Sequence, residues 1–302
     1  MTRFSVSSSC FVLIALLLNL SASAHSAEDE TKIDFQPLQP GTSVHETSRM
    51  ELAFSIQGEK GDAKKTVLEQ KQSGLKKRTL TLLERAPDGV EKLQAVYETY
   101  TQQLERTGIE PQTRHDPVEG KTYSVLRAAS EATNAKLEIT DEKKAEPPAA
   151  EIKTVTRDLR QAYASAARFA SLLKDVALTP GQKIDVPDEV KDELAGGTGP
   201  GGMQAEAYNL TFKEMRENKK ENRQEAVFTL EMKLAKAEPA FKMSVEMKGE
   251  LVYRRLDGAP LSITLNGPVT ISGAQGDGET RTQLSGGGTL KVEVVTEYSA
   301  AK

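Results

Sequence analysis

The chain has 302 residues, of which 37% are hydrophobic, 28% are charged and 5% are aromatic, with no tryptophan. Its 40 basic and 44 acidic residues give a net charge of -4. An acidic chain with both signs of charge interspersed does not attract polyanions, so the balance argues against nucleic acid and against an anionic membrane surface as partners. A chain of this length can form a core that holds without disulfides.

The first 24 residues have the pattern of an export leader. Arg3 precedes an apolar run over residues 11–20, and Ala22-Ser23-Ala24 is a small-x-small cleavage signal. The run, about ten residues, is too short for the roughly 20 that a membrane-spanning helix needs. We therefore expect a signal peptide at residues 1–24, a periplasmic or secreted location, and no transmembrane segment in the mature chain. An uncleaved membrane anchor is the alternative. The single cysteine, Cys10, lies in the leader, so the mature chain has no disulfide.

The N-terminal part of the mature chain is predicted to be a flexible segment followed by strands. Residues 25–41 are polar and show no sustained periodicity, which is typical of a flexible segment. Apolar side chains then alternate over residues 50–56, as a half-buried strand requires. A second strand is predicted over residues 78–84, and Pro87-Asp88-Gly89 supplies turn chemistry after it. We expect a hairpin here.

The run over residues 90–104 fits two kinds of element. Its apolar side chains recur at helical spacing, but Leu93, Ala95 and Tyr97 also alternate with polar residues. The Tyr, Thr and Val content favours a pleated surface. We therefore predict a strand, followed by short strands over residues 123–126 and 136–139.

One long amphipathic helix is predicted over residues 151–177, after a charged connector that contains Pro147 and Pro148. The apolar stripe consists of Ile152, Val155, Leu159, Ala162, Ala166, Phe169, Leu173 and Val176. Because several of these are alanines, a sheet face can approach closely. The helix either plugs or lids a curved sheet or is an ordinary packing helix, and apolar stripes usually belong to the core.

A short helix is expected at residues 186–194, with Pro187 near its start. The glycine-rich stretch 196–202 is expected to be a loop. It lacks the Lys-Ser/Thr pair that follows the glycines of a phosphate-binding loop.

Long amphipathic strands dominate the last third of the chain. The apolar alternation covers residues 208–212, 226–234, 243–253, 261–265, 269–271 and 290–294. Turns are expected at Leu256-Asp257-Gly258-Ala259-Pro260 and at Asn266-Gly267-Pro268. Each strand has one apolar and one polar face, which predicts an antiparallel sheet covered on one side only.

These elements predict an α+β fold, mainly β, in which a curved antiparallel sheet or incomplete barrel packs on one long helix. Residues 42–302 then form a single β-rich domain. Two separate β domains joined by the helix are the alternative.

The sequence contains no constellation with the spacing of a known catalytic or metal site. His45-Glu46 and His115-Asp116 are isolated pairs without ligand spacing. Ser171 and Lys174 have the spacing of serine acyl-enzymes, but the companion motifs are missing. Asp277-Gly278-Glu279 lacks the other oxygen ligands of a calcium loop. We expect a protein that is not an enzyme, with no cofactor and no metal site.

The inner face of the predicted sheet remains as the candidate for function. It carries large or pliable apolar residues, and methionines adapt to variable apolar ligands. The candidate ligand-binding residues are Tyr208, Phe212, Phe228, Met232, Met243, Met247 and Tyr253. They are core if the helix fills the concavity, and they line a site for an acyl chain or a similar ligand if it does not.

Two resemblances agree with this fold. The order of leader, helix and long antiparallel strands resembles the half-barrel of periplasmic lipoprotein carriers. The segments 181–194, with Val186-Pro187-Asp188, and 248–268 resemble uncharacterised exported bacterial β-rich proteins. Neither resemblance brings a catalytic residue.

The expected function is that of a non-catalytic exported envelope protein that binds a lipid or other apolar ligand, or a partner protein, through its curved sheet. A structural or interaction module of the cell envelope with a filled core, and an unrecognised hydrolase, are the alternatives.

Overall fold

The computed structural model describes residues 32–60, 63–87, 89–128, 136–195, 203–238, 241–275 and 282–300. The predicted leader at residues 1–24 and the glycine-rich loop at 196–202 lie outside the described residues. So do Asp88 of the predicted hairpin turn and the Asp277-Gly278-Glu279 turn.

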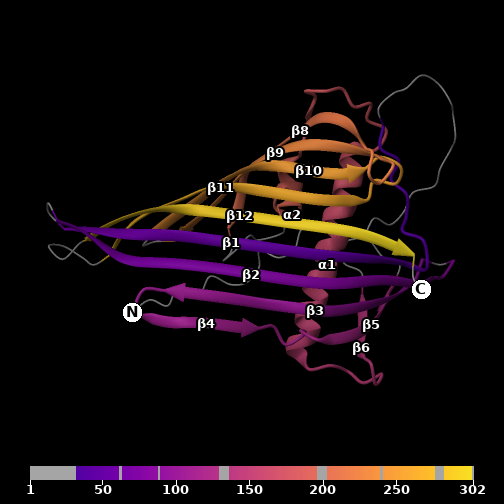
Figure 1. Ribbon diagram of the computed structural model, residues 1–302, viewed down its shortest axis with the longest axis horizontal. Helices are drawn as coiled ribbons and strands as arrows, with labels where there is room; N and C mark the ends of the chain where they lie inside the picture. Colours follow the sequence, from indigo (N-terminus) through magenta and orange to yellow (C-terminus); the bar gives the residue numbers. More distant parts are fainter. Residues whose placement is uncertain are drawn as a thin grey trace.

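Strands make up most of the described residues, and Figure 1 shows their arrangement. In chain order the elements are β1 (Thr42–Lys60), β2 (Ala63–Arg85), β3 (Glu91–Arg106), β4 (Ile109–His115), β5 (Lys121–Arg127), β6 (Leu137–Asp141), α1 (Ala149–Leu173), β7 (Lys183–Ile184), α2 (Asp188–Leu194), β8 (Gln204–Asn218), β9 (Arg223–Glu238), β10 (Phe241–Arg254), β11 (Pro260–Gln275) and β12 (Thr282–Ala300). Among the described residues, neither helix is long and apolar enough to cross a membrane.

All strands belong to one antiparallel sheet with the order β6-β5-β3-β2-β1-β12-β11-β10-β9-β8-β7, and β4 pairs with β3 off this path. The sheet is not closed into a barrel. Because β1 pairs with both β2 and β12, the two halves of the chain share one sheet. The predicted fold, an antiparallel sheet on one long helix, is therefore confirmed, and the strands of both halves belong to one continuous sheet.

The ambiguous run at residues 90–104 is a strand, β3, as predicted. It pairs with β2 along nearly its whole length, so the hairpin between them is confirmed as well. The alternating residues Leu93, Ala95 and Tyr97 lie on one pleated face and are fully buried, whereas Val96, which also fits helical spacing, lies on the other face. Residues 90–104 fit both helical spacing and strand alternation, and hydrogen bonding to strands on both sides makes them a strand.

The turn predicted at Asn266-Gly267-Pro268 is wrong. These residues lie inside β11, which runs unbroken from Pro260 to Gln275. Proline has no N–H to donate, and the pairing of β11 with β10 is interrupted at this point, between the pairs Val245–Val269 and Lys248–Asn266. Pairing with β12 continues through Pro268, so the two neighbouring strands override the local turn chemistry.

Helix α1 packs on one face of the sheet, which we call the inner face. In Figure 1 it crosses the strands near one end of the sheet, and the strands run on well past it toward an end where they converge. We call that end, which includes the β1–β2 and β9–β10 connections, the narrow end. The helix ends at Leu173, before the predicted residue 177, and Asp175 just beyond it has a positive φ of 60°.

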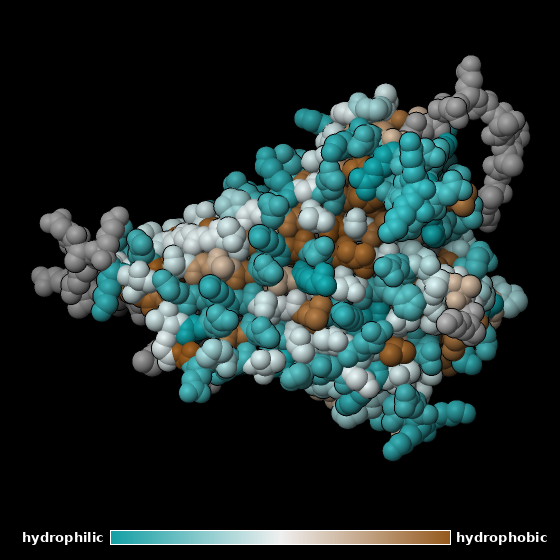
Figure 2. Space-filling model, in the orientation of Figure 1, coloured by the Kyte–Doolittle hydropathy of each residue, from teal (hydrophilic) through white to brown (hydrophobic). Residues whose placement is uncertain are grey.

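The outer face of the sheet is the polar one. Figure 2, in the orientation of Figure 1, shows hydrophilic and neutral side chains over most of this surface, with smaller hydrophobic areas between them. The alternation in the sequence thus separates a polar, solvent-exposed face from an apolar one, as an antiparallel sheet covered on one side requires.

A line of inner-face glycines crosses three neighbouring strands. A Cβ atom on Gly249 would lie 1.8 Å from the carbonyl oxygen of Thr264, and one on Gly267 would lie 1.7 Å from that of Glu246. On Gly288 it would lie 2.0 Å from the carbonyl oxygen of Ala53. The line steps toward the narrow end from β10 to β12. Glycines in strands permit close backbone approach at bends, so this line marks where the sheet folds over.

The segment before β1 packs against the β10–β11 turn. The N–H of Asp34 donates to the carbonyl of Arg255, and the N–H of Gln36 donates to that of Asp257, both at 3.1 Å. Phe35 lies against Gly258, which has a positive φ of 64°. The described part of the segment expected to be flexible is therefore tethered to the sheet.

Candidate functional site

The seven residues proposed from the sequence share the inner face of β8, β9 and β10. The strand register pairs Tyr208 with Met232 and Met232 with Met247, which forms one row across the three strands. A second row, closer to α1, contains the pair Phe212–Phe228. The structure therefore brings the candidate residues together, but in two rows with different surroundings.

The aromatic row is filled by α1. The ring of Phe169 stacks on that of Tyr253 with centroids 4.1 Å apart, and it meets the ring of Phe228 edge-on at 5.6 Å. Phe228 in turn contacts Phe212 edge-on at 5.5 Å. Interlocked aromatic rings of this kind form a packed core. This part of the inner face is core.

The methionine row lies beyond the reach of α1. Met247 and Met243 are six and ten residues from Tyr253 along β10, which corresponds to about 20 and 33 Å at the rise of a strand. A helix with its side chains is only about 10–12 Å wide. Phe169 of α1 also contacts Phe228, which pairs with Leu251 of β10, so the methionine row begins four residues, about 13 Å, beyond the residues that α1 contacts. The helix covers the aromatic row and leaves the methionine row to other contacts.

An apolar wall continues from the methionine row to the narrow end. We call this set the narrow-end wall. Besides Met232, Met243 and Met247 it comprises Leu52, Phe54, Ile56, Leu68, Leu234, Val245, Val269 and Ile271, which belong to the same hydrophobic cluster. All of these except Met243 are buried. The wall combines rigid β-branched side chains with pliable methionines.

Two glutamines interrupt the narrow-end wall on β2. Gln70 lies beside Phe54 and Gln72 beside Leu52 in the register, and the two residues are only 3% and 5% exposed. The Oε1 atom of each is buried and has no hydrogen-bond partner among the described residues. Buried polar atoms without a partner are rare in folded proteins, so this pair needs an explanation.

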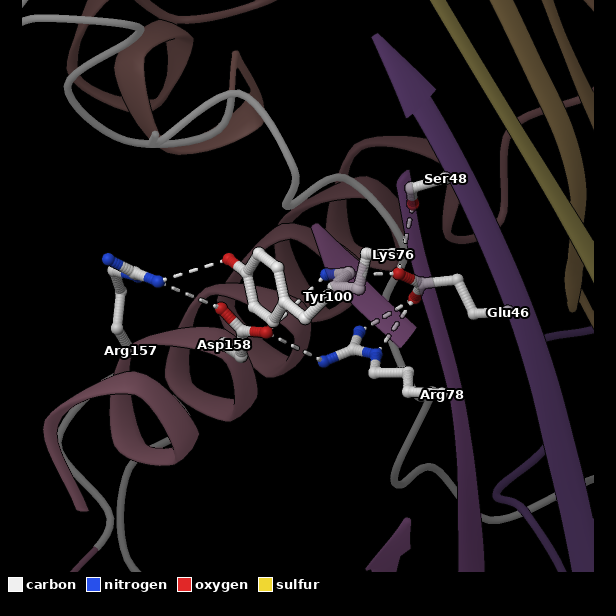
Figure 3. A network of polar contacts seen from close by, with 7 residues as sticks. All are labelled: Glu46, Ser48, Lys76, Arg78, Tyr100, Arg157 and Asp158. Atoms are coloured by element: carbon white, nitrogen blue, oxygen red, sulfur yellow. Dashed lines mark hydrogen bonds and ion pairs between the residues drawn. The ribbon is translucent and has the colours of Figure 1, made fainter. Parts of the chain in front are cut away.

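A buried network of charges joins α1 to β1 and β2 (Figure 3). Arg78 Nη2 lies 2.6 Å and Lys76 Nζ 3.1 Å from the carboxylate of Glu46. Both cations also face Asp158 of α1, at 3.5 Å for Lys76 and 3.8 Å for Arg78. All four side chains are at most 2% exposed. Two cations and two anions balance, so the network places no net charge in the core.

The network holds Glu46 in its ionised form. Burial by itself raises the pKa of a carboxyl group, but the charges and hydrogen bonds of Arg78 and Lys76 outweigh burial here, so the pKa of Glu46 lies below its ordinary value. Burial raises the pKa of Tyr97, which keeps this phenol neutral. The network thus holds helix α1 to the sheet through buried ion pairs.

Further polar contacts connect α1 to the sheet. Glu151 accepts hydrogen bonds from Tyr123 Oη and from Lys121 Nζ, both at 2.6 Å. Tyr163 Oη donates to Glu91 at 3.3 Å, and the same carboxylate pairs with Arg127 at 3.2 Å. Polar contacts therefore anchor α1 over β2, β3 and β5, and aromatic contacts anchor it over β9 and β10.

Reading the sequence did not reveal these buried polar residues. The signal was present in the alternation: counting back from Phe54 in steps of two places Glu46 on the inner face, and counting back from Leu82 does the same for Arg78, Lys76 and Gln72. The strands predicted over residues 50–56 and 78–84 are too short to include Glu46, Lys76 or Gln72.

His45, His115 and Ser171, which were also considered from the sequence, lie on the surface. His45 contacts Thr79 Oγ1 at 2.9 Å and Ser299 Oγ at 3.0 Å, and His115 contacts Glu119 at 2.9 Å. Ser171 is exposed near the end of α1. Within the part of the chain that the structure describes, no group of three or more His, Cys, Asp or Glu side chains gathers as metal ligands would.

Comparison with known proteins gives distant likenesses of fold only. No family model matches the chain, and no curated protein matches its sequence. A structure of lipovitellin, concerned with its lipid–protein interactions, covers 87% of the chain at 11% identity and a TM-score of 0.40; the chain spans only 26% of that protein. An outer membrane channel from Pseudomonas putida F1 is similar over 91% of the chain and 100% of its own length, at 8% identity and a TM-score of 0.23. No family is assigned to the chain.

Proposed function

We propose that the protein is a non-catalytic exported binding protein that takes an apolar ligand, such as a lipid chain, against the narrow-end wall. The observation that carries the proposal is the extent of this wall: along β10 it continues to Met247 and Met243, about 13 and 26 Å beyond Leu251, whose partner Phe228 contacts α1. An apolar surface with methionines, which repack around different shapes, suits a ligand of variable structure.

The open topology of the sheet supports ligand entry. The wall residues are buried, so binding requires the surrounding parts of the fold to move apart. The terminal strands of the sheet order, β6 and β7, are not paired with each other. An open sheet therefore widens by bending, without breaking a closed ring of hydrogen bonds as a barrel would have to.

A structural or interaction module with a filled core is the second candidate. The stacking of Phe169 on Tyr253 favours it, because that contact shows that the helix fills the aromatic part of the inner face. The two candidates differ in one property: a filled module does not take up an apolar molecule at the narrow end.

Fluorescence titration with diphenylhexatriene, an uncharged hydrocarbon probe, tests the proposal. We expect saturable binding by the wild type and at least about tenfold weaker binding by Met232→Trp, because the larger ring occupies the wall. Met247→Phe gives the same test with a smaller change of volume. Unfolding curves check that each variant is folded.

Lys233→Trp is the matched control. Lys233 is the next residue of β9, and its ion pair with Glu206 places it on the outer face. This variant is expected to bind the probe like the wild type. A folded wild type that does not bind the probe, or equal binding by Met232→Trp and Lys233→Trp, would contradict the proposal.

A further inference from the structure

The two buried amides of β2 lie where a ligand on the narrow-end wall would pass. In the register, Gln72 of β2 pairs with Leu52 of β1, which pairs with Leu290 of β12. Leu290 pairs with Gly267 of β11, and Met247 of β10 lies next to Gly267, so these residues form one row across the sheet. Gln70 follows on the same face, about 7 Å nearer the narrow end. The amides therefore share the inner face with the methionines that the proposed function assigns to ligand binding.

The two unpaired amide oxygens do not stabilise the fold. A buried carbonyl oxygen without a partner costs about 1–3 kcal/mol. An apolar side chain fits the neighbouring inner position of the same strand, where Leu68 is buried. Gln70 and Gln72 thus present two unpaired acceptors to an otherwise apolar surface.

Resting on the proposed function, we infer that the ligand is a neutral amphiphile whose head group carries a hydrogen-bond donor, a hydroxyl or an amide N–H, and that Gln70 and Gln72 accept from it. The apolar tail then lies along the methionines. Long-chain alcohols, monoacylglycerols and fatty amides have this chemistry, and esters or hydrocarbons without a donor do not.

Two cations on the inner face define the competing class of ligand. Arg106 pairs with Gln70 in the register of β2 and β3, Lys236 pairs with Met243 in that of β9 and β10, and both cations are partly exposed. A carboxylate head would be attracted to these cations and repelled by the two amide oxygens. The inferred ligand is neutral because the two acceptors are buried, where their effect is stronger than that of partly exposed cations.

Displacement of diphenylhexatriene by three oleyl compounds tests the inference. Oleyl alcohol donates a hydrogen bond, methyl oleate only accepts, and oleate carries a charge. We expect oleyl alcohol to displace the probe at about fivefold lower concentration than methyl oleate, which corresponds to about 1 kcal/mol for one hydrogen bond. In Gln70→Leu/Gln72→Leu the ratio is expected to fall to about one.

The variants keep the inference separate from the proposed function. Removing two unpaired acceptors leaves the fold intact or stabilises it, so the double variant should still bind diphenylhexatriene. Gln103→Leu, an exposed position on β3, should retain the wild-type ratio. Equal displacement by alcohol and ester, a preference that survives in the double variant, or tightest displacement by oleate would each overturn the amide anchor. Loss of probe binding by the wild type would instead overturn the proposed function.

Discussion

Replacing Glu46 with glutamine is expected to lower the free energy of unfolding by about 3–5 kcal/mol, the usual loss when one partner of a buried ion pair is removed. Glu46 contacts both Arg78 and Lys76, and the variant leaves these two buried cations with Asp158 as their remaining carboxylate in the network of Figure 3. Chemical denaturation at neutral pH measures the difference.

The pH dependence of stability separates this effect from a simple packing defect. Because the folded-state pKa of Glu46 lies below its ordinary value of 4.5, its contribution is complete above that value and is lost as the pH falls toward the lowered pKa. Glu46→Gln has no carboxyl group at this position, so its free energy of unfolding should fall less than that of the wild type as the pH is lowered.

An exposed pair provides the control for Glu46. Glu293→Gln breaks the outer-face pair of Glu293, which is 49% exposed, with Arg49, and should change stability by less than about 1 kcal/mol. If Glu46→Gln is as stable as Glu293→Gln, the network does not lock α1 to the sheet.

Gly288→Ala is expected to destabilise the protein by about 3 kcal/mol or more, at the upper end of overpacking effects. The added Cβ would lie 2.0 Å from the carbonyl oxygen of Ala53 and 2.6 Å from Phe54 Cα, so backbone and not a flexible side chain would have to move. The fold of the sheet toward the narrow end depends on this close approach. Thermal or chemical unfolding measures the loss.

The adjacent glycine provides a control with the opposite expected sign. A Cβ on Gly287 meets nothing closer than 3.6 Å, because this residue faces the other side of β12. Gly287→Ala should be neutral or stabilising by up to about 1 kcal/mol, since alanine loses less conformational entropy on folding. Similar losses for both variants would show that the glycine line is not a site of backbone crowding.

Local alternation in the sequence predicts much of this fold. It identifies β3 as a strand despite a competing helical pattern, and it places the seven candidate residues on one face. It fails at Asn266-Gly267-Pro268, because the turn chemistry of three residues cannot show that β10 and β12 will pair on either side.

The division of the candidate site into two rows was not predictable in the same way. It depends on where α1 crosses the sheet, which is set by contacts such as Lys76 with Asp158, 82 residues apart in the chain. The stripe of α1 predicts that the helix packs, but not over which strands. The candidate residues therefore separate into filled core at Phe212, Phe228 and Tyr253 and the wall at the methionines only once the fold is known.

Native mass spectrometry of protein purified gently from the exported fraction shows whether the narrow-end wall holds a ligand. We expect a chain that has lost residues 1–24 and carries a bound amphiphile, released by collisional activation as a neutral or singly charged small molecule. Met232→Trp should carry less of it. An exported chain that shows only its own mass, under conditions in which diphenylhexatriene also fails to bind, would contradict the claim that the narrow-end wall is a ligand site.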